Sequence, residues 1–493
     1  MTELKGGDLS VRGARGGGLV LVGSGATFVI QVASLLILSR LLTPSDFGLV
    51  AMVTIFVVLG NLLRDFGLPL AGLQEQSLSR QQASNLFWMS AATAAIFSIL
   101  MAASTPALID LFREPRLAQI VPALAISVFL GGMTSQLQVQ LARNMQFGAL
   151  VASDVIGQLA GLAVAIVLGI AGAGYWALVA QSLTAAALVL VYRWIASRWI
   201  PLAPSRGPDA LRLFKIGATY SVAQLLAYVQ SNIGTMLIGT QLGVTQLGYY
   251  NRAYQLLTAP AGRFLDPLTQ VVISTLNRAK DEQRDPDALL CKIQFGVGSL
   301  IVWVFAVTAG TAPGLIPLVL GDQWRPAVTV FQILAIGGSV LVFNHVNYWA
   351  FIVKEQPRAL LHYNLVSKPL EIASIFIGSQ FGLDGVAWGY AAAVVFSWPL
   401  FLIWLSRATG LSTRRFFTNG CQILLAGVFG SAASAAVYLA LAPLATFLCV
   451  LGGVFAGTIA FAAVLLAIPA SRTQLADWSR LVRSALLRQR EAL

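Results

Sequence analysis

Long apolar runs separated by short polar gaps follow one another along the whole chain. Fourteen runs reach about 20 residues, the length that an α-helix needs to cross a membrane. The stretch 416–471 holds no charged residue but is too long for one helix, and Ala442-Pro443 divides it into a hairpin. The predicted spans are 17–39, 46–63, 83–105, 119–141, 149–170, 174–196, 213–239, 245–276, 290–312, 326–351, 361–381, 384–406, 418–441 and 445–469.

Lys and Arg residues gather in alternate gaps between the spans. Cytoplasmic loops carry an excess of these residues, and most of the 32 here fall in both tails and in every second gap. Arg193 is counted with the loop cations that follow the sixth span. The opposite gaps hold only Arg40, Arg113, Arg116 and Arg325. We therefore expect an even number of spans with both termini in the cytoplasm.

Short motifs recur 200 to 211 residues apart, which indicates an internal repeat of six spans. The matching pairs are Leu42 with Leu242, Gly48 with Gly248, Arg143 with Lys354 and Gly174 with Gly385. The alternative is that polytopic proteins in general place Gly and Trp at helix starts. The repeat predicts an all-α polytopic membrane protein of about 14 transmembrane helices, with two pseudo-symmetric six-helix bundles and two extra C-terminal helices.

The expected organisation follows from the spans and the repeat. It comprises a cytoplasmic N-terminal tail (1–16), an N-terminal six-helix lobe (17–200), a cytoplasmic linker (201–212), a C-terminal six-helix lobe (213–410), helices 13 and 14 (411–470) and a cytoplasmic tail (471–493). In that last tail, apolar residues recur at helical spacing among arginines. This pattern predicts a basic amphipathic helix on the inner leaflet, with a solvated tail as the alternative.

Composition excludes several classes of protein. Of the 493 residues, 57% are hydrophobic and only 11% are charged, whereas soluble domains carry about 25% charged residues. The mean hydropathy is +0.77. The net charge of +12 would suggest nucleic acid in a soluble protein, but here it reflects topology. The loops are too short for a soluble catalytic domain, and no P-loop, HExxH or GxSxG pattern occurs, so we expect no enzyme.

Metal and cofactor chemistry is not indicated either. The three cysteines are isolated, and there are only two histidines. No disulfide framework, metal site or cofactor follows from them.

Charged residues inside spans are the main functional candidates, since a charge in the membrane is costly. Arg252 and Arg263 are eleven residues apart, about three helical turns, and so share one face of the eighth span. Asp266 lies three residues beyond Arg263, and a structural pair between them is the alternative to a cavity role. Lys368 and Glu371 form a similar couple. Snorkelling to the interface is the alternative for Arg252 and Lys368.

Further candidates lie near span ends and among the polar residues of the spans. Arg64 ends the second span, Arg40 ends the first and favours a pair with Asp46, and Asp154 is a candidate for proton coupling. Amide and aromatic side chains suit sugar hydroxyls and sugar faces, although interhelical hydrogen bonds are the commoner use. The candidates of this kind are Gln136, Asn232 and Tyr249.

Several motifs, spread from the first span to the twelfth, carry a resemblance to a known family. They are Ser39-Arg-Leu-Leu-Thr-Pro-Ser-Asp-Phe-Gly-Leu-Val, Asp65-Phe-Gly-Leu, the segment 143–147, Gly172-Ala-Gly-Tyr-Trp-Ala-Leu-Val, Leu247-Gly-Tyr-Tyr-Asn-Arg-Ala-Tyr and Leu320-Gly-Asp-Gln-Trp. With them the chain resembles the Wzx-type polysaccharide flippases, in their exopolysaccharide and colanic-acid branch, of the multidrug/oligosaccharidyl-lipid/polysaccharide exporter superfamily. It departs from related sequences at 234–239, where they often carry an Asp. That departure argues against cation coupling through such a carboxylate here.

The resemblance implies a transporter of the bacterial inner membrane. It would flip undecaprenyl-pyrophosphate-linked oligosaccharides to the outer leaflet by alternating access, for exopolysaccharide or lipopolysaccharide synthesis. The implied partners are that lipid-linked oligosaccharide, membrane lipids and the polysaccharide polymerase and export machinery, with no nucleic acid. Arginines would bind the pyrophosphate, because their planar donors match phosphate oxygens. The alternative function is a drug/cation antiporter of the related efflux type, which favours twelve spans and buried carboxylates.

Overall fold

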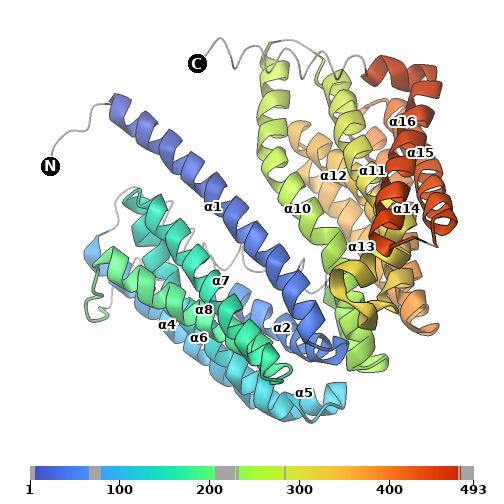
Figure 1. The fold of residues 1–493 in the computed structure, drawn as a ribbon. Helices are drawn as coiled ribbons and strands as arrows, with labels where there is room; N and C mark the ends of the chain where they lie inside the picture. The colour runs from blue at the N-terminus through green and yellow to red at the C-terminus, as the bar shows by residue number, and fades with distance from the viewer. Residues whose placement is uncertain are drawn as a thin grey trace. The chain divides into compact units, whose positions relative to one another are not determined.

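A computed structural model describes residues 6–65, 79–205, 228, 232–282, 285–442, 444–475 and 478, and the regular structure in these ranges is entirely helical. The chain divides into two compact units, Met1–Gly248 and Tyr249–Leu493. Figure 1 draws the helices of the first unit from blue to green and those of the second from yellow-green to red. The predicted all-α architecture is therefore confirmed.

The first unit is built around α6, which packs against α2, α4 and α8, while α7 packs against α1 and α8. Apolar side chains of α6, such as Leu117, Ile120 and Val128, are fully enclosed. The helices of this unit are α1 (Gly6–Leu41), α2 (Pro44–Asp65), α4 (Arg80–Ala103), α5 (Thr105–Phe112), α6 (Leu117–Arg143), α7 (Phe147–Ile170), α8 (Trp176–Ser197) and the first turn of α10 (Val244–Asp281).

In the second unit, α12 packs against α11 and α14, α13 packs against α14, and α15 packs against α11 and α16. Its core holds the large enclosed rings of Trp349, Phe295 and Phe343. Beyond α10 its helices are α11 (Pro286–Leu320), the 3-10 turn η1 (Asp322–Trp324), α12 (Ala327–Val353), α13 (Pro357–Ser379), α14 (Gly382–Thr409), α15 (Arg414–Ala440) and α16 (Thr446–Ala467).

Eleven helices of the described chain are long and apolar enough to cross a membrane. Two more, α10 and α13, coincide with the predicted spans 245–276 and 361–381 but carry more polar residues. The predicted span 213–239 lies mostly outside the described residues. The chain is thus a multi-pass membrane protein whose helices follow the predicted order.

The internal repeat is visible in the turns of the two units. Met145 between α6 and α7 and Glu355 between α12 and α13 both adopt a positive φ, and so do Gly172 and Gly382 one helix later. Both pairs are 210 positions apart, one position from the spacing expected from sequence. The packing order recurs as well, because α4·α6, α6·α8 and α7·α8 correspond to α11·α12, α12·α14 and α13·α14. The pseudo-symmetric bundles are therefore confirmed.

Two other expectations concern segments outside the description. The linker 201–212 is described only to residue 205, and the tail 471–493 only at 471–475 and 478. The division between lobes at this linker and the membrane-surface helix of the tail stay predictions. The compact first unit continues beyond the linker to Gly248, since Tyr228 donates a hydrogen bond to the Ile55 carbonyl, 2.8 Å away.

Candidate functional site

A cavity with both polar and apolar walls lies within the first unit, between α1, α6, α7 and α8. Its volume is about 210 Å³. The middle of α1, the end of α6, the start of α7 and the end of α8 wall it, so it lies toward the end of the bundle that carries the basic gaps. Its lining residues are Val20, Gly23, Ser24, Thr27, Gln138, Leu150, Val151, Asp154 and Arg193.

Arg193 occupies the centre of the polar part of this cavity. Its side chain is only 7% exposed. Its Nε donates to Ser153 Oγ at 2.9 Å, its Nη1 to Gln138 Oε1 at 2.9 Å and its Nη2 to Asp154 Oδ1 at 2.7 Å. The side chain of Asp154 remains 44% exposed. Arg193 therefore holds one oxygen of the carboxylate while the rest of the carboxylate faces the cavity.

Small residues bring the cavity walls together. A Cβ at Gly157 of α7 would contact the Ala185 carbonyl oxygen of α8 at 3.0 Å, and one at Gly161 would contact the Gln181 carbonyl oxygen at 2.7 Å. A Cβ at Gly23 of α1 would overlap the Val151 side chain. Close helix packing through small residues is usual in membranes. Here it brings Arg193 within reach of α6 and α7.

The assignment of Arg193 to the loop cations after the sixth span was wrong, because this residue lies within α8 and is buried. An unpaired buried charge costs several kcal/mol, so the cation requires its three acceptors. The sequence position of Arg193 did not reveal its burial, since only four residues follow it in α8. The available signal was Asp154 in the preceding span, which needed a cation. Sequence reasoning considered Asp154 alone.

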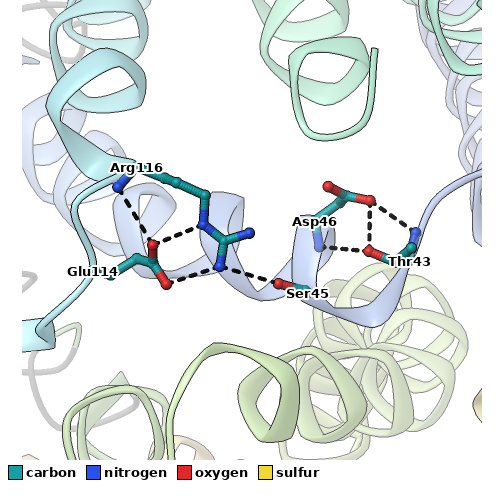
Figure 2. Close-up of polar contacts among 5 residues, drawn as sticks. All are labelled: Thr43, Ser45, Asp46, Glu114 and Arg116. Atoms are coloured by element: carbon teal, nitrogen blue, oxygen red, sulfur yellow. Dashed lines mark hydrogen bonds and ion pairs between the residues drawn. The ribbon is translucent and has the colours of Figure 1, made fainter. Parts of the chain in front are cut away.

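A second polar cluster closes the opposite end of the first unit, where α1 meets α2 and α5 meets α6 (Figure 2). Arg116 binds both oxygens of Glu114, at 2.7 and 2.9 Å, and approaches Ser45 Oγ at 3.4 Å. The hydrogen bond from Arg116 holds the pKa of Glu114 below its usual range. Beside it, Asp46 accepts hydrogen bonds from the backbone and hydroxyl of Thr43, at 2.9 and 2.7 Å. These residues cap α2 and tie the loops together.

Arg40 lies in the last turn of α1, and its side chain is exposed. The hydrogen bonds of Asp46 described above come from Thr43. The predicted pair between Arg40 and Asp46 stays a prediction.

In the second unit, the predicted candidates lie on α10 and α13. Arg252 is 9% exposed, and its Nη1 donates to Gln255 Oε1 at 2.8 Å. Lys368 and Glu371 form an ion pair of 2.9 Å with partly exposed side chains. Tyr249 makes an edge contact with Trp324, with ring centroids 6.0 Å apart. The structure thus gives Arg252 an amide partner and Lys368 a carboxylate partner.

The remaining candidates are distributed over both units. Gln136 is buried in α6, and its Nε2 has no partner among the described residues. Asn232 is half-buried and donates to the Tyr228 carbonyl at 3.0 Å. The side chains of Arg64, Arg263 and Asp266 lie outside the described part of the chain. Within that part, no group of three or more His, Cys, Asp and Glu residues could hold a metal ion.

The helical bundles with polar residues inside them define a polytopic membrane protein of a transporter fold. Solved structures share it. The inward closed conformation of the lipid II flippase MurJ aligns with a TM-score of 0.69 at 11% identity, covering 90% of this chain and 97% of that one. An inward-facing multidrug resistance MATE family transporter of the MOP superfamily aligns with a TM-score of 0.59 at 14% identity, covering 78% and 96%. These likenesses show the fold.

Sequence comparison identifies the family. Residues 37–329 match the family described as "Polysaccharide biosynthesis protein", and the chain belongs to this family. It is 25% identical to the teichuronic acid biosynthesis protein TuaB of Bacillus subtilis (strain 168), over 74% of this chain and 76% of that protein. It is 19% identical to the lipopolysaccharide biosynthesis protein WzxC of Escherichia coli (strain K12), over 79% and 80%. The succinoglycan biosynthesis transport protein ExoT of Rhizobium meliloti (strain 1021) is 24% identical, over 64% of each chain. The resemblance to Wzx-type polysaccharide flippases is confirmed.

Proposed function

We propose that this protein flips undecaprenyl-pyrophosphate-linked oligosaccharide repeat units from the cytoplasmic to the outer leaflet of the bacterial inner membrane. The observation that carries the proposal is the similarity, over about three quarters of the chain, to proteins of teichuronic acid and lipopolysaccharide biosynthesis. A third relative is named as a transport protein. Since these relatives serve different polysaccharides, what they share is a step common to such pathways, and moving a lipid-linked intermediate across the membrane is such a step.

The physical problem of this step is to carry a charged head group and sugars through about 30 Å of hydrocarbon. Cations inside the helices offset the pyrophosphate charge, and Arg252, Arg263 and Lys368 are the proposed residues, with Arg64 and Arg40 at the two ends of the path. Tyr249, Asn232 and Gln136 are proposed to contact sugars. Arginine suits a phosphate best because its donors are planar and paired.

The driving force is proposed to include the membrane potential. With the cytoplasm negative, an anionic head group moving outward releases about 2.3 kcal/mol per charge per 100 mV. Coupling through a carboxylate has three candidates, Asp154, Asp266 and Glu371. Two of them are engaged with cations, Asp154 with Arg193 and Glu371 with Lys368.

Gene deletion with complementation tests the proposal. In a deletion strain, lipid-linked repeat units are expected to accumulate on the inner leaflet, and the wild-type gene restores export. Normal polysaccharide export from the deletion strain, in the absence of a paralogue, contradicts the proposal. If drug efflux changes and polysaccharide does not, the antiporter function replaces it.

A further inference from the structure

The cavity in the first unit offers hydrogen-bonding capacity that the protein itself does not use. Asp154 Oδ1 is held by Arg193, whereas Oδ2 has no hydrogen-bond partner among the described residues. The Asp154 side chain is 44% exposed and lines the cavity, while that of the arginine bonded to it is 7% exposed. Three of the guanidinium N–H groups are taken by Ser153, Gln138 and Asp154. Arg193 therefore orients the carboxylate, and the carboxylate is the group presented to a ligand.

The charges of the cavity select the class of ligand. Among the described lining residues, Asp154 and Arg193 are the only charged ones, and together they are formally neutral. A cation placed at the carboxylate is repelled by the neighbouring guanidinium, and an anion placed at the guanidinium is repelled by the carboxylate. A neutral ligand rich in hydroxyl groups faces neither penalty, because each hydroxyl both donates and accepts.

The rest of the lining matches such a ligand. Ser24 and Thr27 of α1 add hydroxyl groups to the cavity wall, and Gln138 adds an amide. Val20, Leu150 and Val151 supply apolar surface for the C–H face of a sugar ring. The volume of about 210 Å³ is of the order of a single ring. The walls come from four helices, so the residues are fixed relative to one another.

We propose that this cavity is a subsite for one uncharged sugar ring of the transported glycan, with Asp154 accepting hydrogen bonds from the sugar hydroxyls. Arg193 is a positioning residue that acts through the carboxylate. This inference rests on the proposed flippase function, since it names a substrate contact for that function. It assigns Asp154 to the glycan rather than to ion coupling. The described residues of the subsite belong to the first unit, whereas Arg252 and Lys368 belong to the second.

Protection of an introduced cysteine tests the subsite. The full-length protein, with Cys291, Cys421 and Cys449 replaced by serine, is reconstituted in lipid nanodiscs and carries Ser24→Cys at the cavity wall. Labelling by a polar maleimide is followed with and without oligosaccharide repeat units, released by partial hydrolysis of the organism's own extracellular polysaccharide. The matched control is Thr54→Cys on α2, which is exposed and outside the cavity.

The expected result is slower labelling at Ser24→Cys in the presence of the oligosaccharide, with no change at Thr54→Cys. Removing a hydrogen bond to a neutral group weakens binding about two- to tenfold, and removing one to a charged group weakens it about ten- to a hundredfold. Thr27→Val should therefore raise the protecting concentration by the first factor, and Asp154→Asn should raise it by up to the second. Thr54→Val removes a similar helix-bonded hydroxyl and should leave it unchanged. Asp154→Asn keeps the shape of the side chain but removes the counter-ion of Arg193. Thr27→Val leaves that ion pair intact, so it tests the subsite even where Asp154→Asn fails to fold.

Several results would overturn the inference. One is unchanged labelling at all oligosaccharide concentrations in protein with a normal unfolding transition. Another is protection that survives Asp154→Asn and Thr27→Val undiminished. A third is labelling that depends on pH and not on glycan, which would make Asp154 a protonation site. Export from the deletion strain tests the flippase function independently of the labelling experiment. Normal export from that strain would contradict the flippase function, and specific protection of Ser24→Cys would still support a sugar site in the cavity.

Discussion

Gly48 of α2 and Gly248 of α10 lie in reciprocal contact with each other's helix. A Cβ at Gly48 would overlap the carbonyl oxygen of Val244, and a Cβ at Gly248 would overlap the carbonyl oxygen of Pro44. Each carbonyl stands four residues before the facing glycine, so the crossing is two-fold symmetric. These glycines are also equivalent positions of the internal repeat. The two occurrences of this motif thus contact each other within the first unit.

Alanine at either glycine should destabilise the protein. The obstructing atoms belong to the backbone and cannot rotate away, so the helices must separate, at a cost of about 1–3 kcal/mol by analogy with overpacked cores. We expect Gly48→Ala and Gly248→Ala to lower the midpoint of thermal unfolding in detergent. Gly148→Ala is the control, because a Cβ there meets nothing within 4 Å. Equal midpoints for Gly48→Ala and Gly148→Ala would contradict the close crossing.

Much of the fold could be predicted because apolar length and charge spacing are local signals. The spans 149–170 and 445–469 match α7 (Phe147–Ile170) and α16 (Thr446–Ala467) within a few residues. The span 290–312 was too short, since α11 continues through Pro313 and Pro317 to Leu320. Proline disrupts soluble helices, but in membrane helices neighbouring groups satisfy the freed carbonyls. Such compensation is tertiary and leaves no local pattern.

The ion pair between Asp154 and Arg193 should contribute strongly to stability. Removing Asp154 leaves the enclosed guanidinium without its counter-ion, which costs up to about 3–5 kcal/mol in buried pairs. Removing Arg193 leaves Ser153, Gln138 and the half-exposed carboxylate without their shared donor. We expect Asp154→Ala and Arg193→Ala each to lower the unfolding midpoint markedly, and the double variant to lose less than their sum. The measurement is a double-mutant cycle of thermal unfolding.

The exposed pair of Asp322 and Arg325 is the matched control for that cycle. Its side chains are 80% and 71% exposed, and such pairs contribute about 0–1 kcal/mol. If the coupling free energy between Asp154 and Arg193 were as small as that of the control pair, the ion pair would not stabilise the folded protein as predicted.

The site was less predictable than the fold because burial and partners decide it. Arg252 and Lys368 were found as charges inside spans. Arg193 was missed because its distance from the helix end resembled that of a loop cation. The pairing of Arg193 with Asp154 joins α8 to α7, and the choice of partners depends on how those helices rotate. Sequence spacing alone does not fix that rotation.

Acid should weaken the cluster formed by Glu114 and Arg116. The hydrogen bond from Arg116 lowers the pKa of Glu114, so the carboxylate stabilises the folded state above the ordinary glutamate value of about 4.3. This contribution is lost as the pH falls through the lowered pKa. Arg116 is 44% exposed, so solvent screening keeps the effect below about 1 kcal/mol. Thermal unfolding followed from neutral to acid pH should show a steeper loss for the wild type than for Glu114→Gln. If the unfolding midpoints of the wild type and of Glu114→Gln fell equally with decreasing pH, the pair would have no role in stabilising the folded state.

Arg252 supplies the sharpest test of the proposed pyrophosphate contact. It is 9% exposed and bonded to Gln255, so contact with a head group requires α10 to expose it at another stage of the cycle. Charge-assisted hydrogen bonds contribute about 1.5–3 kcal/mol, which predicts a loss of export of roughly ten- to a hundredfold in Arg252→Ala. Arg252→Lys keeps the charge without the planar fork and should recover only part of it. Arg278→Ala on the same helix is the control, because that side chain is 82% exposed. Export is measured against the amount of inserted protein, and wild-type export from Arg252→Ala would remove this residue from the substrate path.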